Sequence, residues 1–153
     1  MKDILDLLGR ILLGFIFLFE AYDSIIFFSE TKAQMLSYGL SWNPNVLLVG
    51  AIGLLSLGGL LLLTGYRVRL GVLLLLLYWI PVTFIVHPYW SFPLDCIGDF
   101  PCADQMENFR RLQSVLFTKN LAITGGLLLV YSNGIHSKFR IKRIFATARV
   151  PGV

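Results

Sequence analysis

Long, nearly uninterrupted apolar stretches constrain this chain more than any other feature. Segments 46–64, 70–90 and 115–132 are apolar almost throughout. The hydrocarbon core of a bilayer is about 30 Å thick, so a spanning helix needs roughly 17–25 mostly apolar residues. Each segment meets that length, which predicts a transmembrane helix for each. Segment 4–28 predicts a fourth, provided that it tolerates its four charged residues: Asp6, Arg10, Glu20 and Asp23.

The composition agrees with a membrane protein. Hydrophobic residues make up 56% of the 153 residues and charged residues 14%, against about 45–50% and 25% in a soluble globular protein. This balance excludes a soluble enzyme domain, a disordered tail and a disulfide-rich secreted scaffold. The expected fold is all-α, a polytopic four-transmembrane-helix bundle whose first partner is the lipid bilayer. No basic surface typical of a nucleic-acid-binding domain is present.

The distribution of basic residues predicts the orientation of this bundle. Segment 4–28 is expected to remain as a helix and not to act as a cleaved signal peptide, because its start is acidic and no small-x-small cleavage site follows it. Eight basic residues then lie at the N-terminus, in the 64–70 turn and in the tail, against three in the 29–45 and 88–114 loops: Lys2, Arg67, Arg69, Lys138, Arg140, Lys142, Arg143 and Arg149 against Lys32, Arg110 and Arg111.

The positive-inside rule therefore predicts cytoplasmic termini in a bacterial inner membrane. Residues 1–135 are expected to form the transmembrane domain. Residues 136–153 are expected to form a basic cytoplasmic tail that lies on anionic lipid.

Polar residues inside the spans form the candidate site. On a helical projection of about 100° per residue, the charges of the first span share one face, which we expect to turn into the protein. Lys119 shares a face with two small residues, which predicts a neighbouring helix beside it. The directions of the spans bring five polar residues to one level near the outer surface: Glu20, Asp23, His87, Lys119 and Asn120. Arg10 completes the candidate ligand-binding set and forms an i, i+4 pair with Asp6 near the cytoplasmic end.

Three interpretations of this set stay open, one of which is that the helices pack differently and the cluster does not form. The charges can neutralise one another and hold the bundle together, as buried ion pairs do. Alternatively, they can form a polar pocket for a quinone head group, a thiol or another small ligand, because ionisable residues inside a membrane are functional candidates by default. No catalytic residue and no metal site is assigned, and quinone is the one cofactor considered.

The outer loop between the last two spans contains both cysteines, Cys96 and Cys102. In an oxidising compartment the two can form a disulfide. The favoured interpretation is a structural loop disulfide. A redox-active pair is the alternative, although the spacing is not Cys-x-x-Cys. Two free thiols, or a metal site with His87, are the remaining interpretations, and a metal site would need more soft ligands than the sequence offers.

Three stretches resemble the DoxX-like family of membrane proteins. They are Gly9-Arg-Ile-Leu-Leu-Gly-Phe-Ile-Phe-Leu-Phe at the start of the first span, His87-Pro-Tyr-Trp at the end of the third, and Phe117-Thr-Lys-Asn-Leu-Ala-Ile-Thr-Gly-Gly in the fourth. The resemblance implies a four-helix membrane bundle. It also implies an association with quinone-linked enzymes that oxidise thiosulfate, or with complexes that respond to thiol stress.

Together these observations predict a membrane subunit of a quinone-linked thiol or sulfur redox system. Its substrates would be a quinone or a thiol, and its partners other redox proteins. Whether the chain is itself an enzyme, as an oxidoreductase subunit, stays open. The alternative is a non-enzymatic membrane scaffold or a small-solute carrier.

Overall fold

The computed structural model describes residues 2–91 and 100–133, and the side chains within 4–91 and 107–133. Every regular element in these ranges is helical, which confirms the predicted all-α class: α1 (Lys2–Ile26), α2 (Phe28–Ser37), α3 (Pro44–Thr64), α4 (Val68–Val86), the short 3-10 helix η1 (Tyr89–Ser91) and α5 (Phe100–Asn133). The predicted basic tail, 136–153, lies outside the described residues.

Four helices have the length to cross a bilayer. Pro44–Thr64, Val68–Ser91 and Glu107–Asn133 are long and apolar enough on their own, and α1 passes the same test together with α2, from which it is bent by 96°. The 25 residues of α1 extend for about 38 Å at 1.5 Å per residue, which is enough to cross without α2. The structure therefore has three candidate spans, or four if α1 and α2 count as one broken span, in agreement with the predicted four-helix bundle.

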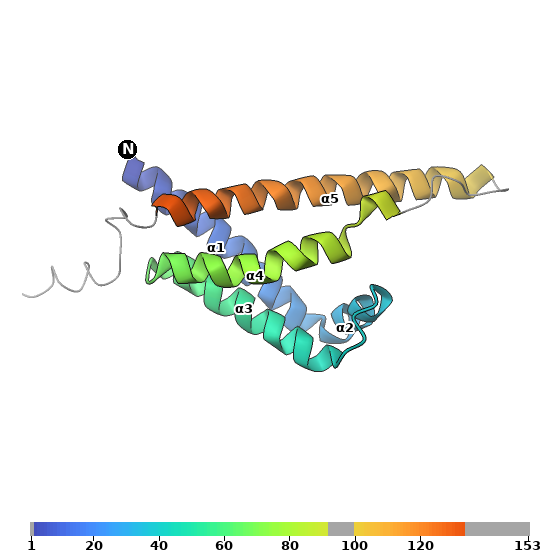
Figure 1. Ribbon diagram of the computed structural model, residues 1–153, viewed down its shortest axis with the longest axis horizontal. Coiled ribbons are helices and arrows are strands. Elements are labelled where there is room, and N and C mark those ends of the chain that lie inside the picture. Colours follow the sequence, from blue (N-terminus) through green and yellow to red (C-terminus); the bar gives the residue numbers. More distant parts are fainter. Residues whose placement is uncertain (1, 92–99, 134–153) are drawn as a thin grey trace, which may run out of the picture.

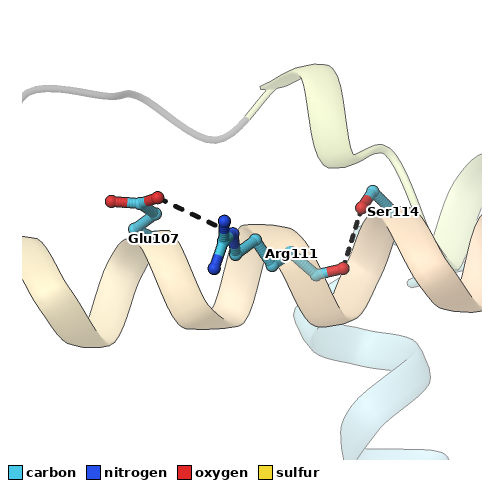
Figure 2. A network of polar contacts seen from close by, with 3 residues as sticks. All are labelled: Glu107, Arg111 and Ser114. Atoms are coloured by element: carbon cyan, nitrogen blue, oxygen red, sulfur yellow. Dashed lines mark hydrogen bonds and ion pairs between the residues drawn. The ribbon is translucent and has the colours of Figure 1, made fainter.

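Two expected loops contain helix instead. Residues 28–37 form α2, which contacts α3 at the end of the bundle where α1 stops, the end called outer below. Residues 100–114 belong to α5, whose 34 residues extend for about 51 Å. Hydropathy missed this outer part because it is polar. This polar part is nevertheless helical, and Figure 2 shows one contact along it: Arg111 Nε lies 3.7 Å from Glu107 Oε1, one helical turn away.

The helices pack in chain order, and the connection between α3 and α4 is short. Helix α1 packs mainly on α3, α3 on α4, and α4 on α5. Gly65 ends α3 with a φ of 66°, a left-handed conformation that glycine adopts without strain. Figure 1 shows the start of α1, the α3–α4 turn and the end of α5 at one end of the bundle, with α2 at the other.

Two adjacent glycines in the middle of α3 set the distances between three helices. A Cβ at Gly58 would lie 3.1 Å from the carbonyl oxygen of Gly71 in α4, and a Cβ at Gly59 would lie 3.2 Å from that of Gly14 in α1. The reciprocal contacts are equally close, at 3.0 and 3.1 Å. Such backbone approach is typical of glycines at helix interfaces in membranes.

Alanine at either glycine should loosen this contact. A Cβ would lie 2.6 Å from Leu75 Cγ at Gly58 and 2.9 Å from Leu18 Cγ at Gly59, so Gly58→Ala and Gly59→Ala should each lower stability by about 1–3 kcal/mol. Gly53→Ala in the same helix is the control, because nothing lies within 4 Å of its Cβ position. Thermal unfolding of the detergent-purified variants measures the difference. A Gly53→Ala variant as unstable as the other two would contradict the packing argument.

Candidate functional site

A ladder of polar contacts joins α4 to α5. Trp79, Thr83 and His87 follow i, i+4 spacing along α4. The Trp79 indole Nε1–H donates to the backbone oxygen of Asn120 at 3.2 Å, and the Asn120 Nδ2 donates to Thr83 Oγ1 at 3.2 Å. Both helices are buried at these positions, with Asn120 and Thr83 each 2% exposed. The ladder fixes the register of the two helices with hydrogen bonds in addition to apolar packing.

Gln113 continues the ladder outward. Its Oε1 lies 2.6 Å from the Nδ1 of His87, and its side chain is buried. Sequence reasoning did not include Gln113, since it was expected to lie in a loop. The sequence feature that could have identified it is its spacing: Gln113 precedes Asn120 by seven residues, which places both on one face of a helix.

Charged groups from α1 and α5 lie beside this ladder. Glu20 of α1 interacts electrostatically with Lys119 of α5, with Asp23 and with His87. Glu20, Asp23 and Lys119 are exposed, and His87 is half-buried. In the part of the chain that the structure describes, no contact within 4.0 Å pairs Glu20 with Lys119. We call the group of Glu20, Asp23, His87, Lys119 and Asn120 the outer polar cluster.

The charged face of α1 turns inward only in part. Arg10, Gly14, Phe17, Ala21 and Ser24 are buried, whereas the acidic residues near the end of the helix are exposed, contrary to the inward orientation expected for the whole face. Figure 1 shows why: α1 lies close to α5 near its start and separates from it toward α2. The outer end of α1 is therefore uncovered on the side that faces α5.

Lys119 also differs from expectation. It was expected to face a neighbouring helix together with Ala122 and Gly126. Only Gly126 does so, since a Cβ there would lie 3.6 Å from Leu13 of α1. Lys119 and Ala122 are exposed. Because Lys119 still interacts with Glu20, it lies at the edge between α5 and α1 instead of inside the bundle.

Arg10 lies apart from the outer polar cluster. It is 1% exposed and its Nε lies 3.3 Å from the Oδ2 of Asp6, as the i, i+4 spacing predicts. Ten residues separate Arg10 from Glu20, or about 15 Å along the helix axis. Arg10 cannot contact a small head group that is bound at Glu20, so its assignment to that ligand site has no geometric support.

Aromatic rings gather at the outer end of α4. Phe84, Tyr89, Trp90 and Phe117 form mutual contacts, with the Trp90 and Phe117 ring centroids 5.4 Å apart and those of Tyr89 and Phe117 5.5 Å apart. Tyrosine and tryptophan are frequent at this level of a membrane protein because their rings are amphipathic. Phe117 comes two residues before Lys119, so the rings share the level of the cluster, although Phe117 and Lys119 leave α5 about 200° apart.

No group of three or more metal-ligating side chains occurs within the described residues. Cys96 lies outside those residues, and the side chain of Cys102 is likewise not described. The disulfide therefore stays a prediction.

The family model of DoxX matches residues 5–88, which is more than half of the chain. This chain belongs to the DoxX family. The match covers α1, α2, α3 and α4 and ends just after His87, whereas Gln113, Lys119 and Asn120 lie beyond it in α5. No curated protein and no solved structure matches this DoxX protein.

Removing the Thr83 hydroxyl should destabilise the bundle. Thr83→Val deletes a bond back to Trp79 O and leaves the buried Asn120 Nδ2 without its acceptor, at a cost of about 0.5–2 kcal/mol. Thr118→Val is a matched control: Thr118 Oγ1 makes the same local bond, to Ser114 O, but is exposed. Thermal unfolding should show a lower midpoint for Thr83→Val alone. Equal effects would mean that the bond between helices adds nothing.

Proposed function

We propose that this DoxX protein is a membrane subunit of a quinone-linked thiol or sulfur redox system, and that the outer polar cluster binds the quinone head group. The observation that carries the proposal is the convergence of an acid, an amine, an imidazole and an amide from three helices at one level. Ionisable groups are costly inside a membrane and are kept where they have a function.

The cluster has the chemistry that a quinone head group needs. The Lys119 ammonium can donate a hydrogen bond to a ring carbonyl, and His87 can carry a proton. The aromatic rings of Phe84, Tyr89, Trp90 and Phe117 offer apolar surface at the same level of the bundle, and small-molecule sites combine apolar surface with a few polar groups. Glu20 and Asp23 adjust the electrostatic potential at the Lys119 ammonium and at the His87 imidazole.

The proposed reaction is balanced between two half-reactions. Two thiols release two electrons and two protons when their sulfurs join as a disulfide, and a quinone takes up two electrons and two protons to become a quinol. A thiol-bearing partner would supply the electrons, and His87 would pass protons at the head group. The chain thereby contributes quinone binding and proton transfer to a complex.

A small-solute carrier is less well supported. Between the level of Arg10 and that of Glu20, the bundle is filled by apolar side chains, with Phe17 and Leu127 fully buried. The Phe17 ring packs edge-on against Trp79, with centroids 5.1 Å apart. These contacts leave the core apolar along the route that a polar solute would have to follow.

Loss of the Lys119 ammonium should weaken quinone binding. A hydrogen bond to a charged group contributes about 1.5–3 kcal/mol, so Lys119→Met should raise the Kd for ubiquinone-1 by roughly 10- to 100-fold. Lys32→Met in α2 is the control, because it removes a lysine that does not belong to the cluster. Titration of the purified protein in lipid nanodiscs measures both. An absence of saturable binding to the unaltered protein would refute the quinone site.

We also propose that the bundle lies in a bacterial inner membrane with both termini in the cytoplasm, on the strength of its basic residues. With Cys96 and Cys102 replaced by serine, a single cysteine at Trp42 should react with a membrane-impermeant maleimide in spheroplasts, and one at Tyr66 should not. Both positions are well exposed, at 75% and 42%, so access to solvent does not distinguish them. The reverse labelling pattern would invert the topology.

A further inference from the structure

We propose that the outer polar cluster binds the reduced, hydrogen-bond-donating form of its ligand, a quinol, more tightly than the oxidised quinone. This inference rests on the proposed quinone site and concerns its selectivity. It follows from two hydrogen-bond networks that fix acceptor atoms in the cluster. The cluster therefore offers more acceptors than donors.

His87 presents an acceptor because of Gln113. The Gln113 Oε1 is an oxygen and can only accept, so the hydrogen in the 2.6 Å contact belongs to His87 Nδ1. In the neutral imidazole, the other ring nitrogen, Nε2, then carries a lone pair. Gln113 is buried and His87 is half-buried, so a buried side chain holds Nδ1 while part of His87 remains accessible. Gln113 is thus a positioning residue that sets the tautomer.

Asn120 presents a second acceptor because of Thr83. The Thr83 hydroxyl uses its one hydrogen to donate to Trp79 O at 2.7 Å. It can therefore only accept from Asn120, which assigns Nδ2 to the 3.2 Å contact and turns Oδ1 away from Thr83. Oδ1 has no hydrogen-bond donor within the described residues, although it is fully buried. A buried acceptor of this kind is costly unless a donor reaches it, and a ligand hydroxyl reaches it only by entering the interface between the helices.

The two forms of the ligand differ in what they can offer these atoms. A quinone has two carbonyl oxygens, which accept, whereas a quinol has two hydroxyl groups, which also donate. His87 Nε2, Asn120 Oδ1 and the Glu20 carboxylate are acceptors, and Lys119 is the donor. A quinone can accept a hydrogen bond from Lys119, but it can donate none to the three acceptors. A quinol can accept from Lys119 and donate to an acceptor, and matched polar groups of this kind discriminate strongly between ligands.

A preference for the quinol changes the redox chemistry of the bound pair. Tighter binding of the reduced form raises the reduction potential of the bound couple above that of the free couple. A tenfold preference corresponds to about 30 mV for a two-electron couple. The site would thereby make the bound quinone a stronger oxidant toward a thiol.

The test compares both forms on one protein. The unaltered protein in nanodiscs is titrated with ubiquinone-1 and, under anaerobic conditions, with ubiquinol-1. We expect a Kd for the quinol at least tenfold lower. Gln113→Leu removes the acceptor that fixes the His87 tautomer, and Asn120→Leu removes the second acceptor of the cluster. Each should lower the ratio of the quinone Kd to the quinol Kd toward one. Trp79→Phe is the control, because it removes another bond between α4 and α5 and leaves both acceptors; its ratio should stay unchanged.

The outcomes separate the selectivity from the site itself. Saturable binding of both forms with equal Kd values, or tighter binding of the quinone, overturns the selectivity and leaves the quinone site standing. No saturable binding of either form overturns both. A ratio that falls as much in Trp79→Phe as in the acceptor variants also overturns the selectivity. If an acceptor variant fails to fold, the ratio measured on the unaltered protein decides.

Discussion

The bundle depends on the backbone contact at Gly58 and Gly59. Consecutive residues of a helix point about 100° apart, so two adjacent glycines let α3 approach two different helices at the same height. One contact is with α4 at Gly71 and the other with α1 at Gly14. Because lipid tails are as apolar as leucine side chains, helices in a membrane gain little from hydrophobic burial and associate through such close packing. Larger side chains at this height would separate all three helices together.

The contrast between the two sides of the bundle explains where its polar residues lie. The α1–α3–α4 side is joined by glycine and leucine packing, whereas α5 is joined to α4 by hydrogen bonds through Trp79, Thr83 and Asn120. Helix α5 also touches α1 near the start of α1, and the two separate toward the outer end (Figure 1). The exposed charges of the cluster lie where that separation leaves α1 and α5 uncovered.

Apolar length and periodicity predict the spans well, because both follow from the thickness of the bilayer. The stripe of Trp79, Thr83 and His87, and the Asp6–Arg10 pair, were also predictable, since each depends on spacing within one helix. The exposure of Glu20 and Lys119 was not, because it depends on the angle between α1 and α5, which no local pattern records. Gln113 and the outer part of α5 were missed for another reason: a polar helix has no hydropathy signal.

The continuity of α5 has a mechanical consequence. One unbroken helix carries Glu107 and Arg111 at its exposed outer part and Gln113, Lys119 and Asn120 a few turns further on. A straight helix is stiff over such a length, so a force applied to its outer end reaches the inner turns as tilt or rotation instead of being absorbed by a hinge. A protein that binds the outer turns of α5 would therefore transmit strain to the hydrogen bonds that align α5 with α4.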